Sequence, residues 1–331
     1  MTIKTIVMPH KGDANVLIEK QLPAPHAKVG QVVIDVEASG VSFAEVQMLR
    51  GRYFNQPAFP FVPGYDSVGI VREIGEGVSS ELIGKRVAAI TVTGGWAEQQ
   101  VLDANNLALV VEGIAPADAV ALVVNGVTAY QLLHRVAKIQ SGQTIVVQGA
   151  SGGVGTLLVQ MARLADVNVI GSASPSKHDV VRSLGATPID YKGDMLAQVR
   201  AIAPESVVAV FDHVGGKTLV DGYRMLKRGG IVVSYGSLST LNNRGHRMLP
   251  FIPLMGRILL WNAIPNGRRA SFYYVQQSPQ HFQNDLTHVL NLLKQGKITS
   301  SVSDQLPLSK ASEALGKLAA GKVTGKLVLI P

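Results

Sequence analysis

The chain contains no cysteine among its 331 residues. Disulfide bonds, thiolate-ligated zinc sites and a cysteine nucleophile are therefore excluded, because each of them requires a sulfhydryl group. Apolar residues make up 47% of the chain, which is enough to build a large hydrophobic core. This composition is typical of a folded globular protein and argues against a disordered chain.

Long apolar runs are missing as well. The most apolar region, residues 107–127, is interrupted by Glu112 and Asp118, so it offers no run of about 18 apolar residues for a transmembrane helix. The first residues also lack the apolar core of a signal peptide. We therefore expect a soluble, cytoplasmic protein that has no membrane partner.

Positive charge is in excess, with a formal net charge of +8 at pH 7, but it forms no stripe. The tight basic groups are Arg50 with Arg52 and Arg268 with Arg269. A nucleic-acid-binding protein usually clusters its basic residues on one face or along one helix. The scattered charge predicts a generally basic surface with no nucleic-acid partner, and it is compatible with small anionic ligands.

The pattern of apolar and polar residues changes near residue 123. Before it, short runs alternate apolar and polar residues between Gly, Pro and Asn, which is typical of β-strands. After it, short apolar strands alternate with helices, and this pattern predicts an α/β fold with a parallel, doubly wound sheet. The expected strands and helices of this part include 144–150, 153–165, 167–173, 176–184, 207–214 and 229–236. Beyond about residue 265 the character is mixed again, with a helix expected at 285–295 and a strand at 326–330.

The segment TIVVQGASGGVGTLLVQMARLA, residues 144–165, allows two interpretations. Residues 149–153 match G-x-S-x-G, the strand–turn–helix elbow that presents a serine nucleophile in α/β-hydrolases. A catalytic triad then needs an acid and a histidine, and the candidates Asp285 and His288 lie one turn apart on a single expected helix. No HGGG-type oxyanion segment precedes the site, so the hydrolase interpretation is disfavoured.

The same turn fits the phosphates of a dinucleotide. Gly152 and Gly153 let the backbone approach a pyrophosphate, and Gly155 lets the following helix pack closely on the strand. The N-terminus of that helix directs free N–H groups at the anion. The full G-x-G-x-x-G pattern places its first glycine at position 150, where this chain has Ala150. On this motif alone, a glycine-rich turn without a ligand therefore stays an alternative.

The second strand of this part, residues 167–173, indicates which nucleotide to expect. A NAD site usually has Asp or Glu about 20 residues beyond the glycines to bind the ribose 2′-hydroxyl, and no acid stands here. Ser172, Ser174 and Lys177 instead offer hydroxyl groups and a positive charge to a 2′-phosphate, which favours NADPH. Ser174 is equally suited to cap a helix before Pro175, and Lys177 to a solvated helix face.

Seven segments of the chain keep a distinctive order and spacing. They are GVSFAEVQMLRGRY (40–53), PFVPGYDSVGIV (60–71), NGVTAYQLL (125–133), GASGGVG (149–155), LGATPIDY (184–191), VFDHVGG (210–216) and GKVTGKLVLIP (321–331). Together they resemble the zinc-independent medium-chain dehydrogenases/reductases of the quinone oxidoreductase (zeta-crystallin-like) branch, over nearly the whole chain. Several motifs in order are far more specific than any one of them.

The resemblance implies two domains and a set of cofactor contacts. A discontinuous, GroES-like, β-rich catalytic domain would comprise residues 1–122 and 265–331, and a Rossmann NADPH-binding domain residues 123–264. The pyrophosphate would lie on Gly152-Gly153-Val154, and the adenosine 2′-phosphate and adenine would be surrounded by Ser174, Lys177 and Tyr191. The residues implied near the nicotinamide are Thr128, Gly236, Phe272 and Tyr273. Tyr191 also has a plain interpretation, an exposed aromatic residue after a strand.

Zinc-bearing relatives of this family use cysteine and histidine ligands, the histidine in a Gly-His-Glu stretch. That stretch is Gly64-Tyr65-Asp66 here, and the cysteine-bearing loop is Val41-Ser42-Phe43. Because the chain has no cysteine and its eight histidines show no ligand spacing, we expect a reductase that binds no metal.

Without a Lewis acid to lower the pKa of an alcohol, an electron-poor hydride acceptor is favoured. We expect hydride transfer from NADPH to a quinone or to the β-carbon of an α,β-unsaturated carbonyl, with hydrogen bonds stabilising the enolate oxygen. By resemblance, Tyr53 is the candidate catalytic donor or positions the acceptor. A packing role for Tyr53, with solvent supplying the proton, is the alternative. Ser42 stands where many relatives have Asn, at a position implied to contact the nicotinamide ribose or the substrate.

The apolar segment LPFIPLMGRILLW, Leu249 to Trp261, is expected to shape an apolar substrate pocket or to form a buried helix and loop. The family implies a homodimer joined through an edge strand of the nucleotide domain, for which GGIVVSYG (229–236) is the candidate. Two other functions stay open. One is a non-catalytic NADPH-binding protein, and the other is a pathway-specific biosynthetic enoyl reductase or cyclase on the same fold.

Overall fold

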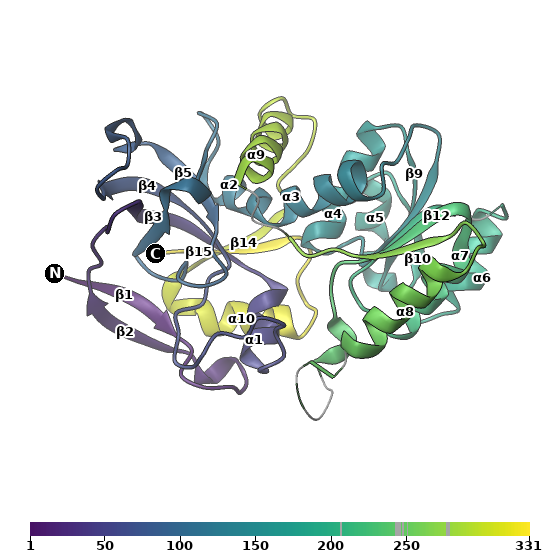
Figure 1. Cartoon of the computed structure of the whole chain (residues 1–331), viewed down its shortest axis with the longest axis horizontal. Coiled ribbons are helices and arrows are strands. Elements are labelled where there is room, and N and C mark those ends of the chain that lie inside the picture. The colour runs from purple at the N-terminus through teal and green to yellow at the C-terminus, as the bar shows by residue number, and fades with distance from the viewer. Residues whose placement is uncertain (206, 242–245, 247, 250, 276–278) are drawn as a thin grey trace. The chain divides into compact units, whose positions relative to one another are not determined.

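The computed structural model describes residues 1–205, 207–241, 246, 248, 249, 251–275 and 279–331. The chain forms two compact units, one from residues 1–127 and 276–331 and the other from residues 128–275 (Figure 1). The first unit is therefore discontinuous, and the second is inserted between its two parts. The divisions follow Val127 and Val275, later in the chain than the expected positions 122 and 264.

Six parallel strands form the sheet of the second unit. Their order is β10-β9-β8-β11-β12-β13. The strands are β8 (Thr144–Gln148), β9 (Asn168–Ala173), β10 (Thr187–Asp190), β11 (Val207–Asp212), β12 (Leu226–Ser234) and β13 (Arg269–Phe272). Strands covered on both faces need almost continuous apolar runs, and the buried IVV of β8 is such a run. The expected α/β fold with a parallel, doubly wound sheet is confirmed.

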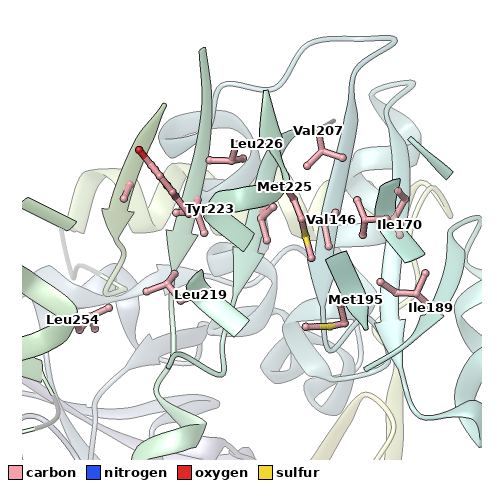
Figure 2. Packing of buried hydrophobic residues seen from close by; sticks show 14 of the residues in the cluster. Val146, Ile170, Ile189, Met195, Val207, Leu219, Tyr223, Met225, Leu226 and Leu254 are labelled. Carbon is pink, nitrogen blue, oxygen red and sulfur yellow. The ribbon is translucent and has the colours of Figure 1, made fainter. Parts of the chain in front are cut away.

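Helices cover both faces of this sheet (Figure 1). Side chains from α6, α7 and α8 pack with alternate strand residues such as Val146 and Val232 to form one buried core (Figure 2). The opposite face carries α4 and α5. The helices of this unit are α4 (Gly153–Leu164), α5 (His178–Ser183), α6 (Met195–Ile202), α7 (Lys217–Met225) and α8 (Phe251–Ala263), with a π-helix at Gln131–Val136 and 3₁₀ turns at Pro175–Lys177 and Leu238–Thr240.

The prediction that residues 229–236 form the edge of the sheet is wrong. β12 lies between β11 and β13 and pairs with both, so the last strand in the order is β13. β13 has only four residues, RASF, and lacks an apolar run such as the IVV of β8. This pairing also explains why residues 269–272 belong to the second unit.

One apolar stripe of α8 is buried and a second is exposed. Phe251 and Leu254 are buried in the core, and Ile258 and Trp261 pack partly against it. The exposed apolar residues on or next to this helix are Leu249, Ile252, Met255, Leu259, Leu260 and Ile264. The expected apolar segment is thus mostly this helix, while its Pro250 lies outside the described residues. In the part of the chain that the structure describes, no helix combines the length and apolar character needed to cross a membrane.

The first unit is β-rich, as expected. Its small sheet pairs β1 (Thr2–Val7) with β2 (Ile18–Pro23), and its larger sheet has the order β14-β15-β3-β4-β5-β7, with β6 pairing with β3. The strands of the larger sheet are β3 (Gln31–Val41), β4 (Asp66–Ile74), β5 (Arg86–Ile90), β6 (Gln99–Asp103), β7 (Ala108–Leu109), β14 (Val302–Pro307) and β15 (Lys326–Ile330). The helices are α1 (Phe43–Leu49), α2 (Pro116–Val123), α9 (Pro279–Lys294) and α10 (Ala311–Ala319), and α3 (Asn125–Tyr130) spans the division between the units. The remaining 3₁₀ turns are Ala14–Val16, Ser80–Leu82, Ala104–Asn106 and Leu308–Lys310.

The register of this sheet joins distant parts of the chain. β15 pairs antiparallel with β3, and Leu327 lies opposite Val41. Lys326 is therefore brought to the point where β3 ends and α1 begins, although more than half of the sequence separates the two.

Candidate functional site

The glycine-rich turn joins β8 to α4 in the second unit. Gly152 is the N-cap of α4, with φ −84° and ψ 176°, and its N–H donates to the carbonyl oxygen of Gly149 at 2.9 Å. Gly152, Gly153 and Val154 are only half-buried, so the start of the helix is accessible. Because the first N–H groups of a helix have no partner within it, this twelve-residue helix presents backbone donors and a positive dipole end to an anion.

The glycines of the turn serve different purposes. A Cβ at Gly155 would overlap the carbonyl oxygen of Gly149, so this glycine permits the close packing of helix and turn. A Cβ at Gly152 would meet only the same oxygen, at 3.3 Å, and no other atom within 4 Å. The space beside Gly152 is therefore open, as a ligand that touches the backbone requires.

The residues expected at the 2′-phosphate follow β9 and β10. Ser172 is buried at 2% exposure, and its Oγ accepts the N–H of Gly149 at 3.2 Å, so it supports the turn from within. Ser174 and Lys177 are half-buried, and the Oγ atoms of Ser174 and Ser176 are 3.1 Å apart. The N–H of Tyr191 donates to the carbonyl oxygen of Ala173 at 3.3 Å, and this bond brings Tyr191 beside the end of β9. Ser174, Lys177 and Tyr191 thus follow adjacent strand ends.

Lys177 and Tyr191 differ in how much of each side chain reaches solvent. Burial lowers the pKa of the Lys177 ammonium, so the cationic form is less favoured than in water. A bound anion offsets that cost. Tyr191 is 51% exposed, and the Lys192 ammonium lies 6.0 Å from the centre of its ring. Its ring is therefore available for stacking.

A histidine that the sequence did not single out follows β11. The ring of His213 packs so closely against Gly149 that a Cβ at Gly149 would overlap it, and its backbone packs against Gly236. Its Nδ1 is buried and makes no hydrogen bond within the described residues. Burial lowers the pKa of His213, so the neutral form of the ring is favoured. The segment VFDHVGG contained this residue, but its histidine gave no spacing signal.

The ends of β12 and β13 hold the other residues expected near the nicotinamide. Phe272 lies opposite Ser234 in the sheet, and the N–H of Tyr273 donates to the carbonyl oxygen of Ser234 at 2.8 Å. The hydroxyl of Tyr273 donates to Oε1 of Gln131 at 2.7 Å. Gln131 is one helical turn beyond Thr128, and both residues are buried. The bond to Gln131 therefore brings Tyr273 close to the helical segment that carries Thr128. Gln131 is a candidate site residue that the sequence analysis did not identify.

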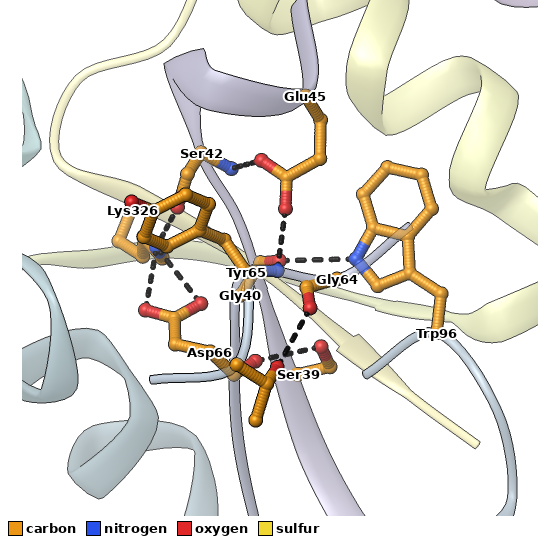
Figure 3. A network of polar contacts seen from close by, with 10 residues as sticks. Ser39, Gly40, Ser42, Glu45, Gly64, Tyr65, Asp66, Trp96 and Lys326 are labelled. Carbon is orange, nitrogen blue, oxygen red and sulfur yellow. Dashed lines mark hydrogen bonds and ion pairs between the residues drawn. The ribbon is translucent and has the colours of Figure 1, made fainter. Parts of the chain in front are cut away.

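The first unit contains a buried polar network around the start of α1 (Figure 3). Glu45 is fully buried, and its two carboxylate oxygens accept the N–H of Tyr65 at 2.7 Å and the N–H of Ser42 at 2.8 Å. Burial raises the pKa of Glu45 to about 7. The Lys326 ammonium and backbone hydrogen bonds, including that of Tyr65, lower this pKa, and the Asp66 carboxylate adds to its rise. Glu45 therefore fastens the backbone at Ser42 to the backbone at Tyr65.

A buried ion pair adjoins this carboxylate. Lys326 Nζ lies 3.1 Å from Asp66 Oδ2, and the two side chains are 3% and 0% exposed. The same Nζ donates to Ser42 Oγ at 2.7 Å. A Cβ at Gly40 would overlap both members of the pair, so glycine is needed there to make room. The cluster defined by Ser42, Glu45, Asp66 and Lys326 is called the lysine cluster below.

Tyr53, the expected catalytic residue, lies next to Tyr65. The two hydroxyl oxygens are 2.8 Å apart, the rings are nearly perpendicular, and both residues are buried. Hydrogen bonds therefore link Ser42 to Tyr53 by way of Glu45 and Tyr65. By the resemblance, Tyr65 stands where zinc-bearing relatives have histidine. In the described ranges, no group of three or more His, Cys, Asp or Glu residues is arranged to hold a metal ion.

The hydrolase interpretation gains no geometric support. Ser151 belongs to the second unit and is 7% exposed, whereas Asp285 and His288 lie on α9 of the first unit.

Two family models match separate parts of the chain. A family model described as an alcohol dehydrogenase GroES-like domain matches residues 28–117, and one described as a zinc-binding dehydrogenase matches residues 184–329. The chain is 32% identical over 318 residues to the rat synaptic vesicle membrane protein VAT-1 homolog, covering 93% of this chain and 78% of that protein.

Two solved structures are similar along nearly all of the chain. The quinone oxidoreductase of Pseudomonas syringae has a TM-score of 0.86 and 26% identity, covering 99% of this chain and 100% of its own. A mycobacterial protein solved as a complex with NADPH has a TM-score of 0.85 and 26% identity, with coverage of 99% and 100%. The chain therefore belongs to the medium-chain dehydrogenase/reductase family of oxidoreductases, in its zinc-independent, quinone-oxidoreductase-like branch.

Proposed function

We propose that this protein is an NADPH-dependent oxidoreductase that delivers hydride to a quinone, or to the β-carbon of an α,β-unsaturated carbonyl, without a metal. The observation that carries this proposal is the accessible turn at Gly152, where helix N–H groups face an open space that a side chain would fill. The similar proteins support it, because one is a quinone oxidoreductase and another was solved with NADPH.

The second unit fits the proposed cofactor. Gly152, Gly153 and Val154 would hold the pyrophosphate through backbone N–H groups, and the neutral ring of His213 lies against the same turn. Ser174 and Lys177 would bind the 2′-phosphate, and Tyr191 would cover the adenine. Thr128, Gly236, Phe272 and Tyr273 would surround the nicotinamide. When bound, NADPH supplies the hydride.

The first unit would act on the hydride acceptor. As the acceptor gains two electrons its oxygen becomes negatively charged, and a positioned hydroxyl group stabilises that charge. Tyr53 is the proposed donor, and its hydroxyl is held at 2.8 Å from that of Tyr65. This contact fixes the direction of the phenol, so Tyr53 would position the acceptor whether the final proton comes from the tyrosine or from water.

The decisive experiment is a panel of quinones, enals and enones assayed with NADPH and with NADH. The proposal expects loss of NADPH absorbance with at least one acceptor class. NADPH binding without turnover of any acceptor would contradict it and would support a second candidate, an NADPH-binding protein without catalysis. That candidate has an observation in its favour, since the rat relative is named for a membrane location and not for a reaction.

The choice of cofactor rests on Lys177. Replacing it with alanine removes the positive charge that would face the 2′-phosphate, and a charge-assisted hydrogen bond contributes about 1.5–3 kcal/mol. We therefore expect Lys177→Ala to weaken NADPH binding about tenfold or more while NADH binding stays the same, as measured by titration calorimetry. Lys192→Ala, at the neighbouring exposed lysine, is the matched control. Equal losses for both nucleotides would contradict the assignment.

We also propose a homodimer, formed through β13 and the exposed stripe of α8. β13 is the last strand in the order of its sheet, and Ile252, Met255 and Leu259 are exposed apolar residues of α8, the helix that packs against this strand. Contiguous apolar surface of this kind usually marks an interface. Sedimentation equilibrium should give twice the chain mass, and Leu259→Glu should reduce it to one chain mass.

A further inference from the structure

We propose that Lys326, acting through Ser42, turns the Ser42 hydroxyl into a hydrogen-bond donor for the negatively charged oxygen of the hydride acceptor. Ser42 would be a catalytic residue and Lys326 a positioning residue. The inference rests on the proposed function and adds to it a metal-free hydrogen-bond donor that a buried ammonium polarises.

The direction of the hydrogen bond between the two side chains is fixed by chemistry. A lysine ammonium has three donors and no acceptor, so Ser42 Oγ accepts from Lys326 Nζ at 2.7 Å. The hydrogen of the serine hydroxyl must then point away from the lysine. Ser42 therefore offers a donor, and the adjacent positive charge makes that donor stronger.

Exposure shows which part of the lysine cluster a substrate is able to reach. Lys326 and Asp66 are buried in the sheet, whereas Ser42 is half-buried at the start of α1. The ammonium itself is thus shielded from solvent, and Ser42 is the less buried residue that it contacts. Because Glu45 Oε2 holds the N–H of Ser42, the backbone that carries this hydroxyl is fixed in place.

The location agrees with this role. Ser42 and Tyr65 stand at the positions that carry cysteine and histidine ligands in zinc-bearing relatives. A catalytic metal there would supply positive charge to the substrate oxygen. In this chain Lys326 lies there, paired with Asp66 at 3.1 and 3.4 Å, and its ammonium is closer to Ser42 Oγ, at 2.7 Å. A hydrogen-bonded charge in a buried site acts more strongly than in water.

The chemical step balances without any further reactant. When the hydride from NADPH adds to the β-carbon of an enone, the electron pair of the C=C bond moves toward the carbonyl, and the carbonyl oxygen becomes an enolate oxygen. The Ser42 hydroxyl donates a hydrogen bond to that oxygen but keeps its proton. A proton from water then adds to the α-carbon, so the acceptor gains one hydride and one proton in total.

The kinetic test compares four variants of the full chain. Ser42→Ala removes the donor, and Lys326→Met/Asp66→Asn removes the charge without leaving an unpaired partner. We expect both to lower kcat about ten- to a hundredfold with KM changed less than about threefold, because the bond strengthens as the oxygen becomes charged. Ser42→Thr keeps a hydroxyl and should recover most of the kcat that Ser42→Ala loses. Ser303→Ala is the matched control, because Ser303 Oγ bonds to the backbone oxygen of Lys326 and not to Nζ.

A second readout needs no turnover. 4-Nitrophenol has a ring of quinone size and one ionisable oxygen, and its absorbance reports ionisation. Bound to the wild-type protein, its pKa should fall by about one unit or more. That shift, which corresponds to a tenfold preference for the anion, should disappear in Ser42→Ala and in the double variant.

Two results would overturn the inference. One is a 4-nitrophenol pKa that is the same in wild type and Ser42→Ala, including the case in which neither binds it. The other is an unchanged kcat in the double variant. Failure of the wild-type protein to oxidise NADPH with any acceptor of the panel is a different outcome. It refutes the proposed function, while the 4-nitrophenol titration still tests the Ser42 donor.

Discussion

The two candidate regions handle charge in opposite ways. In the second unit, the turn at Gly149–Gly155 presents backbone N–H groups, and glycine keeps side chains out of the way. In the first unit, the lysine cluster buries two carboxylates and an ammonium within a β-rich core. One region needs small residues so that an anion is able to approach the backbone, and the other needs particular charged side chains that stabilise one another.

This contrast determines which amino-acid substitutions disrupt each region. A backbone site tolerates changes in its neighbours but is blocked by a single added methyl group. A buried ion pair tolerates replacement of both partners but not of one, because the remaining charge then stays buried without compensation. The predictions below separate these two kinds of failure, beginning with the largest expected effect.

Replacing Lys326 with methionine should have the largest effect on stability. Asp66 would be left as an uncompensated buried carboxylate, and breaking such a pair typically costs about 3–5 kcal/mol of unfolding free energy. In the double variant Lys326→Met/Asp66→Asn most of this loss should be recovered. Urea denaturation of the two variants and the wild type measures the difference.

The control for this prediction is Lys317→Met. Lys317 pairs with Glu313 at 2.9 Å, but both side chains are more than 40% exposed, so little change in stability is expected. If Lys326→Met behaves like Lys317→Met, the buried pair does not differ from a surface pair and the contrast between the two regions is lost.

Glu45 should make stability depend on pH. The pKa of Glu45 is about 7 in the folded protein and 4.5 for an ordinary solvated glutamate, so between these pH values the folded state holds a proton that the unfolded chain has released. The free energy of unfolding should therefore fall as pH rises from about 4.5 to 7, by up to about 1.4 kcal/mol per pH unit. Glu45→Gln should remove this slope.

The measurement compares the slopes of unfolding free energy against pH, because glutamine accepts at only one of its two terminal atoms and shifts the absolute value at every pH. Other carboxyl groups contribute equally to both proteins and cancel in the difference. Glu81→Gln, at an exposed carboxylate, is the matched control and should keep the wild-type slope. A parallel pH profile for Glu45→Gln would show that Glu45 stays ionised across this range.

The sequence predicted the second unit more completely than the first, for a physical reason. The turn from β8 to α4 and its glycines are neighbours along the chain, so a short motif contains most of the information about them. The lysine cluster is not visible in this way, because Lys326 and Asp66 meet only when β15 pairs with β3. The sequence showed Ser42 and Tyr65 as positions without zinc ligands and gave no sign of the lysine beside Ser42 and Asp66.

Within the second unit, the missed features also depend on long-range contacts. β13 is too short and too polar to be recognised before it pairs with β12, and its omission led to the wrong edge strand. His213 and Gln131 are ordinary residues in the sequence. They became candidates because one has a buried nitrogen without a bond to the described residues and the other accepts the hydroxyl of Tyr273.

Two alanine substitutions in the glycine-rich turn should separate packing from ligand approach. At Gly155 the new Cβ would overlap the carbonyl oxygen of Gly149, and overpacking of this kind costs about 1–3 kcal/mol, more than the roughly 1 kcal/mol that alanine adds in helix propensity. At Gly152 the backbone has φ −84° and the Cβ meets one oxygen at 3.3 Å, so stability should change little.

The two substitutions should weaken NADPH binding for different reasons. Gly152→Ala places a methyl group in the space where the pyrophosphate would approach the backbone, so NADPH should bind at least about tenfold more weakly to a protein of nearly unchanged Tm. Gly155→Ala should lower Tm first and binding only as a consequence. Titration calorimetry with thermal melts distinguishes the two. A Gly152→Ala variant that binds NADPH as tightly as the wild type would place the phosphates elsewhere and would remove the basis for treating this turn as the anion site.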